Sequence, residues 1–169
     1  SAFGLTVIPL FVWMGFICFS SGISKRLYDG ATKWMGSLQG GIAIATVAAS
    51  AGFSAICGSN TATSATMGTV ALPQMRTHNY DREFSTGIIA TGGTLGAIIP
   101  PSTVLIVYGL QTLQSIRELF LASIFPGILL TGLIIAVTYF RCRVNPRLGP
   151  PGPATGLLEK VRALGVFQQ

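Results

Sequence analysis

A short polar segment interrupts a long apolar run near the middle of the chain. Residues 34–75 contain no charged side chain, yet their centre carries a glycine followed by hydroxyl and amide side chains. Polar groups in hydrocarbon cost several kcal/mol each unless a partner satisfies them. We therefore expect this segment to line a protected cavity or a ligand site. Its candidate binding residues are Gly58, Ser59, Asn60, Thr61, Thr63 and Ser64.

The polar segment predicts two half-helix ends that meet at the tip of a hairpin. A half-helix over 42–57 would end near Cys57 with carbonyl oxygens that lack helical partners and suit a cation such as Na⁺. A second half-helix beginning around Thr61–Ser64 would offer N–H groups and a positive dipole end to an anion. The structural alternative is that each hydroxyl only caps a helix end or bonds to a neighbouring helix.

A second interrupted segment lies at residues 91–102. Pro100 and Pro101 lack a backbone N–H and force the residue before them out of helical geometry. The carbonyl groups around Gly96–Ile99 therefore lose helical partners, as in the discontinuous helices of secondary transporters. A simple kink is the alternative, but we expect the two interrupted segments to face each other. The candidate site residues here are Thr94, Gly96, Ile98, Pro100, Pro101 and Ser102.

The composition predicts an all-α integral membrane protein. Of the 169 residues, 50% are hydrophobic and only 9% are charged, whereas soluble domains contain about 25% charged residues. No strand pattern is evident. Long charge-free runs each exceed the roughly 20 residues that a helix needs to cross the hydrocarbon core; these are 1–24, 34–75, 84–116 and 119–140.

The distribution of basic residues predicts a re-entrant hairpin. All Lys and Arg residues except Arg117 lie in the loops at 25–33 and 76–82 or after residue 140, which the positive-inside rule places in the cytoplasm. Run 34–75 must then enter and leave the membrane on the same side. Its first half-helix would measure about 24 Å, so the tip would stop inside the membrane.

These observations divide the chain into a transmembrane repeat and a tail. The repeat covers 1–143, with a span at 3–22, a re-entrant hairpin at 39–75, a broken span at 84–110 and a span at 116–140. Residues 144–169 are predicted to form a cytoplasmic tail, because 144–156 are rich in proline and glycine and read as a flexible linker. Residues 157–167 could form a short amphipathic surface helix.

Several other classes of function lack support. No acidic residue lies within an apolar run, which argues against a carboxylate proton relay and an intramembrane hydrolase, and no nucleophile–base pair is recognisable. We therefore expect no enzyme activity.

The net charge of +6 arises in loops beside apolar runs, so it predicts topology rather than nucleic-acid binding. In the charged loops, His78 is expected to be solvated, and Asp29, Asp81 and Glu83 are expected to pair with nearby Arg and Lys side chains at the surface. Free thiols are expected for Cys18, Cys57 and Cys142.

A series of motifs over residues 5–140 resembles the large membrane subunit of the tripartite ATP-independent periplasmic (TRAP) transporters, the DctM-like family. The motifs are Ile8-Pro9-Leu10-Phe11, Gly58-Ser59, Leu72-Pro73-Gln74-Met75 with Tyr80-Asp81, Gly96-Ala97-Ile98-Ile99-Pro100-Pro101-Ser102, Tyr108-Gly109, and Leu119-Phe120-Leu121-Ala122 with Pro126-Gly127. The resemblance implies an inverted-repeat, elevator-type permease of the bacterial or archaeal cytoplasmic membrane.

The resemblance also implies partners and a coupling ion. Such permeases take an organic anion, such as a dicarboxylate or sialic acid, from a periplasmic binding protein, and they require a small membrane subunit. Transport is coupled to Na⁺, and no other cofactor is implied. This chain would cover roughly one repeat, so the second repeat of the same subunit is a further expected partner. The implied Na⁺ ligands are Ser59, Asn60 and Gly96.

Two rival functions remain open on the sequence. The first is a Na⁺/anion symporter of another family, which would work without a binding protein or a small subunit. The second is a non-transporting membrane assembly subunit that keeps the hairpin for packing. In that case Ser59→Ala, Asn60→Ala and Gly96→Ala would lower stability without any ion dependence.

Overall fold

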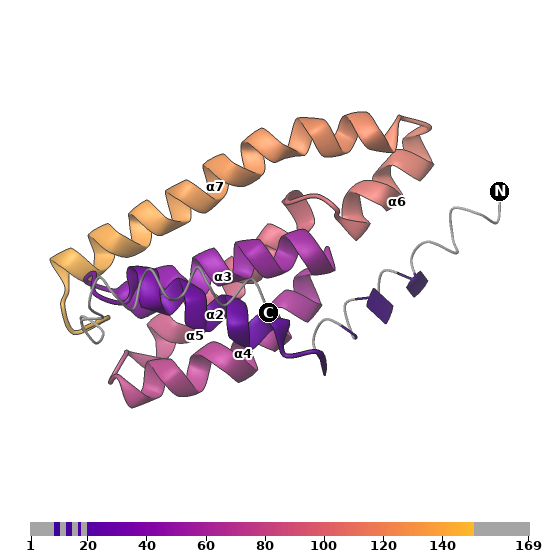
Figure 1. The fold of residues 1–169 in the computed structure, drawn as a ribbon. Helices are drawn as coiled ribbons and strands as arrows, with labels where there is room; N and C mark the ends of the chain where they lie inside the picture. Colours follow the sequence, from indigo (N-terminus) through magenta and orange to yellow (C-terminus); the bar gives the residue numbers. More distant parts are fainter. Residues whose placement is uncertain (1–8, 11–12, 15–16, 18–19, 151–169) are drawn as a thin grey trace.

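A computed structural model describes residues 9–150 apart from 11–12, 15–16 and 18–19. This part of the chain contains helices and no strand, which confirms the all-α prediction for it (Figure 1). Most of the predicted span 3–22 and all of the predicted surface helix 157–167 lie outside the described residues. The helices beyond residue 22 are α2 (Ile23–Met35), α3 (Gly41–Cys57), α4 (Asn60–Thr77), α5 (Arg82–Ile98), α6 (Thr103–Thr112) and α7 (Ile116–Val144).

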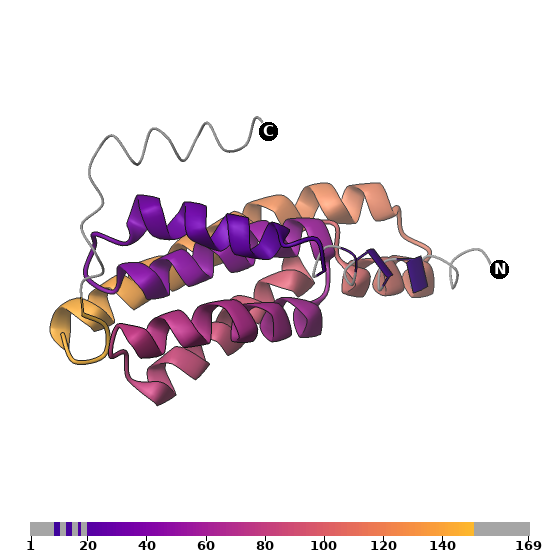
Figure 2. The same ribbon diagram turned by 60° about the horizontal axis from the view of Figure 1, so that its bottom comes forward.

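The central hairpin consists of α3 and α4, with α2 and α5 packed beside it and the long helix α7 on the outside (Figures 1 and 2). Helix α3 is the most enclosed of these, and its Phe53 and Cys57 have no exposed surface. They pack in one core with Met67 of α4 and Leu95 of α5. Because glycines of α5 lie against Ser50 of α3 and Ser64 of α4, α5 approaches both arms of the hairpin closely.

Within the described residues, two stretches are long and apolar enough to cross a membrane. They are Arg82–Thr112, which contains α5 and α6, and Ile116–Val144, which is α7. Helix α7 exposes large apolar side chains, including Phe125 at 74% and Ile128 at 69%, and such a surface marks contact with lipid or a partner. These features agree with the membrane class. Entry of the α3–α4 hairpin into the bilayer stays a prediction.

The prediction of a loop at 25–33 is wrong, because these residues lie in helix α2. The segment is rich in charge, but its buried residues follow the spacing of a helix. Ser24 and Tyr28 are four residues apart and buried, and Leu27 packs against the core. Lys25 and Asp29, on the other face, are exposed. The charged residues therefore occupy one side of an amphipathic helix rather than a turn.

The start of the predicted flexible linker is fixed against the base of the hairpin. The Tyr80 hydroxyl donates to the Pro150 carbonyl at 3.0 Å and accepts from the Ile42 N–H at 3.3 Å. The Asp81 N–H donates to the Leu148 carbonyl at 3.4 Å. Tyr80 therefore joins the segment after α7 to the first residues of α3. The carbonyls of Leu148 and Pro150, within the predicted flexible linker, are both hydrogen-bonded.

Removing the Tyr80 hydroxyl should weaken this base in a pH-dependent way. Burial raises the pKa of Tyr80 from 10 to about 12. The unfolded chain releases this proton first, so stability should fall as the pH rises from 10 towards 12. Tyr80→Phe should lower stability at neutral pH by roughly 0.5–1.5 kcal/mol for each lost hydrogen bond and show a smaller alkaline loss.

Thermal unfolding in detergent over a pH series would test this expectation. Tyr108→Phe is the control, because Tyr108 on α6 is 53% exposed. If Tyr80→Phe lost as much stability at alkaline pH as the unmodified chain does, the role given to Tyr80 would be contradicted.

Candidate functional site

The hairpin reverses direction at Gly58 and Ser59. Gly58 adopts a left-handed conformation with φ 61°, and its N–H donates to the Ser54 carbonyl at 2.8 Å, which ends α3. Ser59 caps the N-terminus of α4, because its hydroxyl accepts from the Ala62 N–H at 3.4 Å. The predicted half-helix 42–57 is confirmed, and the second half-helix begins at Asn60, slightly before the predicted start.

The second interruption lies where the prolines predict it. Helix α5 ends at Ile98 and α6 begins at Thr103, so the broken helix is confirmed. In a continuous helix the N–H groups of residues 100 and 101 would bond to the carbonyls of Gly96 and Ala97, but prolines have none. The Ser102 hydroxyl donates to the Ala97 carbonyl at 2.7 Å. No donor to the Gly96 carbonyl is seen among the described residues.

The hairpin tip and the broken helix are in direct contact, as expected. Thr103 donates to the Gly58 carbonyl through both its N–H and its hydroxyl, each at 3.0 Å. A Cβ atom at Gly96 would lie 2.9 Å from the carbonyl carbon and oxygen of Ser59 and 3.0 Å from the Asn60 nitrogen. Only glycine permits this backbone approach.

Asn60 carries the most unusual polar group at this contact. Its side-chain oxygen Oδ1 is buried and has no hydrogen-bond partner among the described residues. Leaving a buried acceptor unsatisfied costs about 1–3 kcal/mol, so the atom calls for an explanation such as a ligand. Oxygen atoms are the ligands that hard cations prefer. The backbone nitrogen of Asn60 lies against Gly96, whose carbonyl also lacks a helical partner.

Ser59 offers less to a cation than the sequence led us to expect. Its carbonyl already accepts from the N–H of Thr63 at 3.0 Å and from the Thr63 hydroxyl at 2.8 Å. Its own hydroxyl lies 3.1 Å from that of Thr61 and caps α4. Within the predicted cation set, Asn60 and Gly96 therefore have the more available oxygens.

The other predicted residues of the tip divide by exposure. Thr61 is exposed at the tip, whereas Thr63 is buried and bonds to Ser54 at 3.3 Å. Ser64 lies against Gly93 of α5. Thr61 is therefore the tip hydroxyl most open to a ligand, and the contacts of Thr63 and Ser64 join helices.

The remaining predicted residues of the break mostly serve its local structure. Thr94 is exposed, and its hydroxyl donates to the Thr91 carbonyl of the same helix at 2.7 Å. Ile98 lies within 3.7 Å of the position of a Cβ at Gly127 of α7. The candidate set omits Thr103, the residue that ties the break to the tip. A hydroxyl directly after Ser102 was the available signal.

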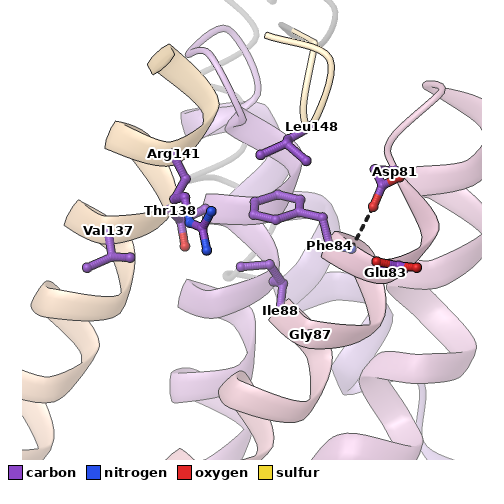
Figure 3. Close-up of a pocket in the computed structure, with 9 residues that line it drawn as sticks. All are labelled: Asp81, Glu83, Phe84, Gly87, Ile88, Val137, Thr138, Arg141 and Leu148. Carbon is purple, nitrogen blue, oxygen red and sulfur yellow. Dashed lines mark hydrogen bonds between the residues drawn. The ribbon is translucent and has the colours of Figure 1, made fainter. Parts of the chain in front are cut away.

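A pocket of about 360 Å³ lies elsewhere, between the first turns of α5 and the last turns of α7 (Figure 3). The hairpin tip contacts the opposite end of α5. Within the described residues, no group of three or more His, Cys, Asp or Glu side chains could hold a metal ion. Runs 34–75 and 84–116 hold no charged residue, so ligands at the tip would meet neutral oxygens and helix ends.

Comparison with known proteins decides the class of the chain. Residues 1–161 match the family model described as "Tripartite ATP-independent periplasmic transporter, DctM component". The chain belongs to the DctM family. This membership confirms the resemblance predicted from the motifs, and it places the chain among transporter permeases rather than enzymes.

Curated members of the DctM family are similar over most of this chain. The C4-dicarboxylate TRAP transporter large permease protein DctM of Pseudomonas aeruginosa is 40% identical over 141 residues, which cover 83% of this chain and 33% of the relative. The isethionate TRAP transporter permease protein DctMQ of Oleidesulfovibrio alaskensis is 40% identical over 140 residues, or 82% of this chain and 22% of the relative. The sialic acid TRAP transporter permease protein SiaT of Haemophilus influenzae is 31% identical over 150 residues, which cover 89% of this chain and 24% of the relative. The chain thus spans about a third or less of the length of these relatives.

Proposed function

We propose that this chain is part of a Na⁺-coupled secondary permease that imports an organic anion. The proposal rests on two observations: the backbone contact of Ser59 and Asn60 with Gly96, and the buried, unpartnered Oδ1 of Asn60. Half-helix ends that meet in this way are the usual ion and substrate sites of secondary transporters. Membership of the DctM family supports a transport role.

The cation would be held by neutral oxygens from both interrupted segments. Asn60 Oδ1 and the Gly96 carbonyl are the first candidates, and Ser59 contributes mainly by fixing the tip through its bonds to Ala62 and Thr63. A bound Na⁺ would supply positive charge between the tip and the broken helix. Both segments would then be held in the arrangement that admits the substrate.

The anion would bind near the first turn of α4. The N–H groups of Ala62 and Thr63 are already bonded by Ser59, which leaves the start of the helix and the exposed Thr61 to face the ligand. C4-dicarboxylates, isethionate and sialic acid, named for the relatives, all carry an anionic carboxylate or sulfonate. An organic acid of this kind is therefore the proposed substrate class.

Transport would require more than this chain. We assign it to one repeat of an inverted-repeat, elevator-type large subunit, with the hairpin re-entrant from the cytoplasmic side. Its partners would be the second repeat, a small membrane subunit and a periplasmic binding protein, in a bacterial or archaeal cytoplasmic membrane. Because substrate sites in such folds form between repeats, one repeat alone should not transport.

Uptake of a radiolabelled C4-dicarboxylate, isethionate or sialic acid into proteoliposomes tests the proposal. The complete permease, with its small subunit, should accumulate one of these anions only with an inward Na⁺ gradient and the loaded binding protein. Uptake without the binding protein would favour the symporter of another family. No uptake of any of the anions under either condition would favour the assembly subunit and contradict the proposal.

A further inference from the structure

The pocket at the base of the molecule lies between two stretches that could each span a membrane. One wall is the start of α5 and the other is the end of α7 (Figure 3). Its volume of about 360 Å³ is within the range of small-molecule sites, roughly 300–1,000 Å³. A ligand of this pocket would therefore lie where the two candidate spans reach the same membrane surface.

The lower part of the pocket is apolar. Phe84 and Ile88 come from α5, and Val137 comes from α7. The Phe84 ring points into the space between the two helices (Figure 3). Val137 is 59% exposed and Ile88 is 8% exposed, so apolar surface continues from the interior of the pocket to the outside of α7. This part suits hydrocarbon rather than a sugar or a nucleotide.

The rim carries opposite charges on opposite walls. Arg141 belongs to α7, whereas Asp81 and Glu83 lie at the start of α5 (Figure 3). Among the described residues no ion pair joins Arg141 to either carboxylate. Asp81 Oδ1 accepts from the Phe84 N–H at 2.9 Å, and no hydrogen bond to its second oxygen is seen among the described residues. A ligand with both a positive and a negative group could bridge the two walls.

We propose that this pocket binds a zwitterionic phospholipid of the phosphatidylethanolamine class. The lipid phosphate accepts hydrogen bonds from Arg141, and its ammonium group donates to Asp81 and Glu83. The upper acyl carbons lie against Phe84 and Val137 and are thereby removed from water. A purely anionic lipid has no ammonium group to pair with the two carboxylates, so it should bind less well. The site is at the opposite end of α5 from the hairpin tip and does not depend on Na⁺ coupling.

Filling the pocket with one side chain gives a direct test. Gly87 lines the pocket, and a Cβ built on it meets no atom within 4 Å. Gly87→Leu should occupy the space while also removing a helix-interior glycine, which favours folding by up to about 1 kcal/mol. Gly68→Leu is the matched control, because Gly68 on α4 has equally open surroundings and lies outside the pocket.

The measurement is native mass spectrometry of the delipidated chain in detergent, with added phosphatidylethanolamine, phosphatidylglycerol or O-phosphoethanolamine. We expect the unmodified chain and Gly68→Leu to bind phosphatidylethanolamine preferentially, and Gly87→Leu to bind it at least tenfold more weakly. Arg141→Gln should weaken the binding of both phosphatidylethanolamine and phosphatidylglycerol. Glu83→Gln should reduce the preference for phosphatidylethanolamine over phosphatidylglycerol.

Three results would overturn the proposal. Equal phosphatidylethanolamine binding by Gly87→Leu and Gly68→Leu would exclude this pocket as the lipid site. Equal binding of the two lipids by the unmodified chain would exclude selection of a zwitterionic headgroup. Binding of O-phosphoethanolamine as tight as that of the lipid would show a site for a soluble ligand instead.

Discussion

Replacing Gly96 with alanine should lower the melting temperature of the chain and separate the hairpin tip from the broken helix. The new Cβ would lie 2.9 Å from the carbonyl carbon and oxygen of Ser59. These are backbone atoms, which cannot rotate away as the end of a long side chain can. Overpacking of this kind costs about 1–3 kcal/mol, and we expect the cost to be at the upper end of that range.

Gly87→Ala on the same helix provides the control for Gly96→Ala. A Cβ at Gly87 meets no atom within 4 Å, so alanine there should raise stability by up to about 1 kcal/mol through helix propensity. The two substitutions should therefore shift the melting temperature in opposite directions. Equal shifts would show that the close approach of α5 to the tip does not contribute to stability.

Replacing Asn60 with alanine should abolish the stabilisation of the complete permease by Na⁺ without destabilising it in K⁺. The substitution removes Oδ1, the buried acceptor that has no partner among the described residues. In K⁺ the loss of an unsatisfied acceptor should leave the melting temperature unchanged or raise it, since such an atom costs about 1–3 kcal/mol. In Na⁺ the unmodified protein should gain stability by mass action, and Asn60→Ala should gain none.

The control for Asn60→Ala is its neighbour in α4. Thr61 is exposed at the same tip, so Thr61→Ala should keep the Na⁺-dependent shift of melting temperature. A loss of stability in Asn60→Ala that is the same in Na⁺ and K⁺ would instead assign the side chain a purely structural role. That result would favour the assembly subunit over the transporter.

The two interruptions of the helices could be predicted because each has a local chemical cause. Pro100 and Pro101 together remove two successive backbone donors, which favours the end of α5 before them, whereas the single prolines Pro73 and Pro126 lie inside α4 and α7. Gly58 can adopt the left-handed conformation that ends a helix, and Ser59 can cap the next one. Because two interrupted segments occur in one short chain, we expected them to face each other. The hydrogen bonds from Thr103 to the Gly58 carbonyl show this contact.

Features set by contacts between distant residues were not predicted. The charges of residues 25–33 indicated a loop because the apolar period of α2 becomes clear only when Tyr28 is seen buried against the core. The proline-rich segment after α7 indicated a flexible linker, since its sequence does not reveal that Tyr80 binds the Pro150 carbonyl. For the same reason the sequence could not separate Asn60, with its unpartnered oxygen, from Thr63, which bonds across the hairpin.

The reaction of Cys57 with a thiol reagent in Na⁺ and in K⁺ reports whether a cation holds the hairpin tip in place. Cys57 has no exposed surface and immediately precedes Gly58, so its labelling requires the packing around the hairpin tip to open. Cys57 and Cys142 are not joined in a disulfide; Cys18 lies outside the described residues. The complete permease would carry Cys57 as its single thiol, with Cys18 and Cys142 changed to serine.

We expect Na⁺, but not K⁺, to slow the labelling of Cys57, because the bound cation should hold the tip against the broken helix. Asn60→Ala in the same background should remove this difference. An equal labelling rate in the two salts, with and without the transported anion, would contradict a cation site at the hairpin tip.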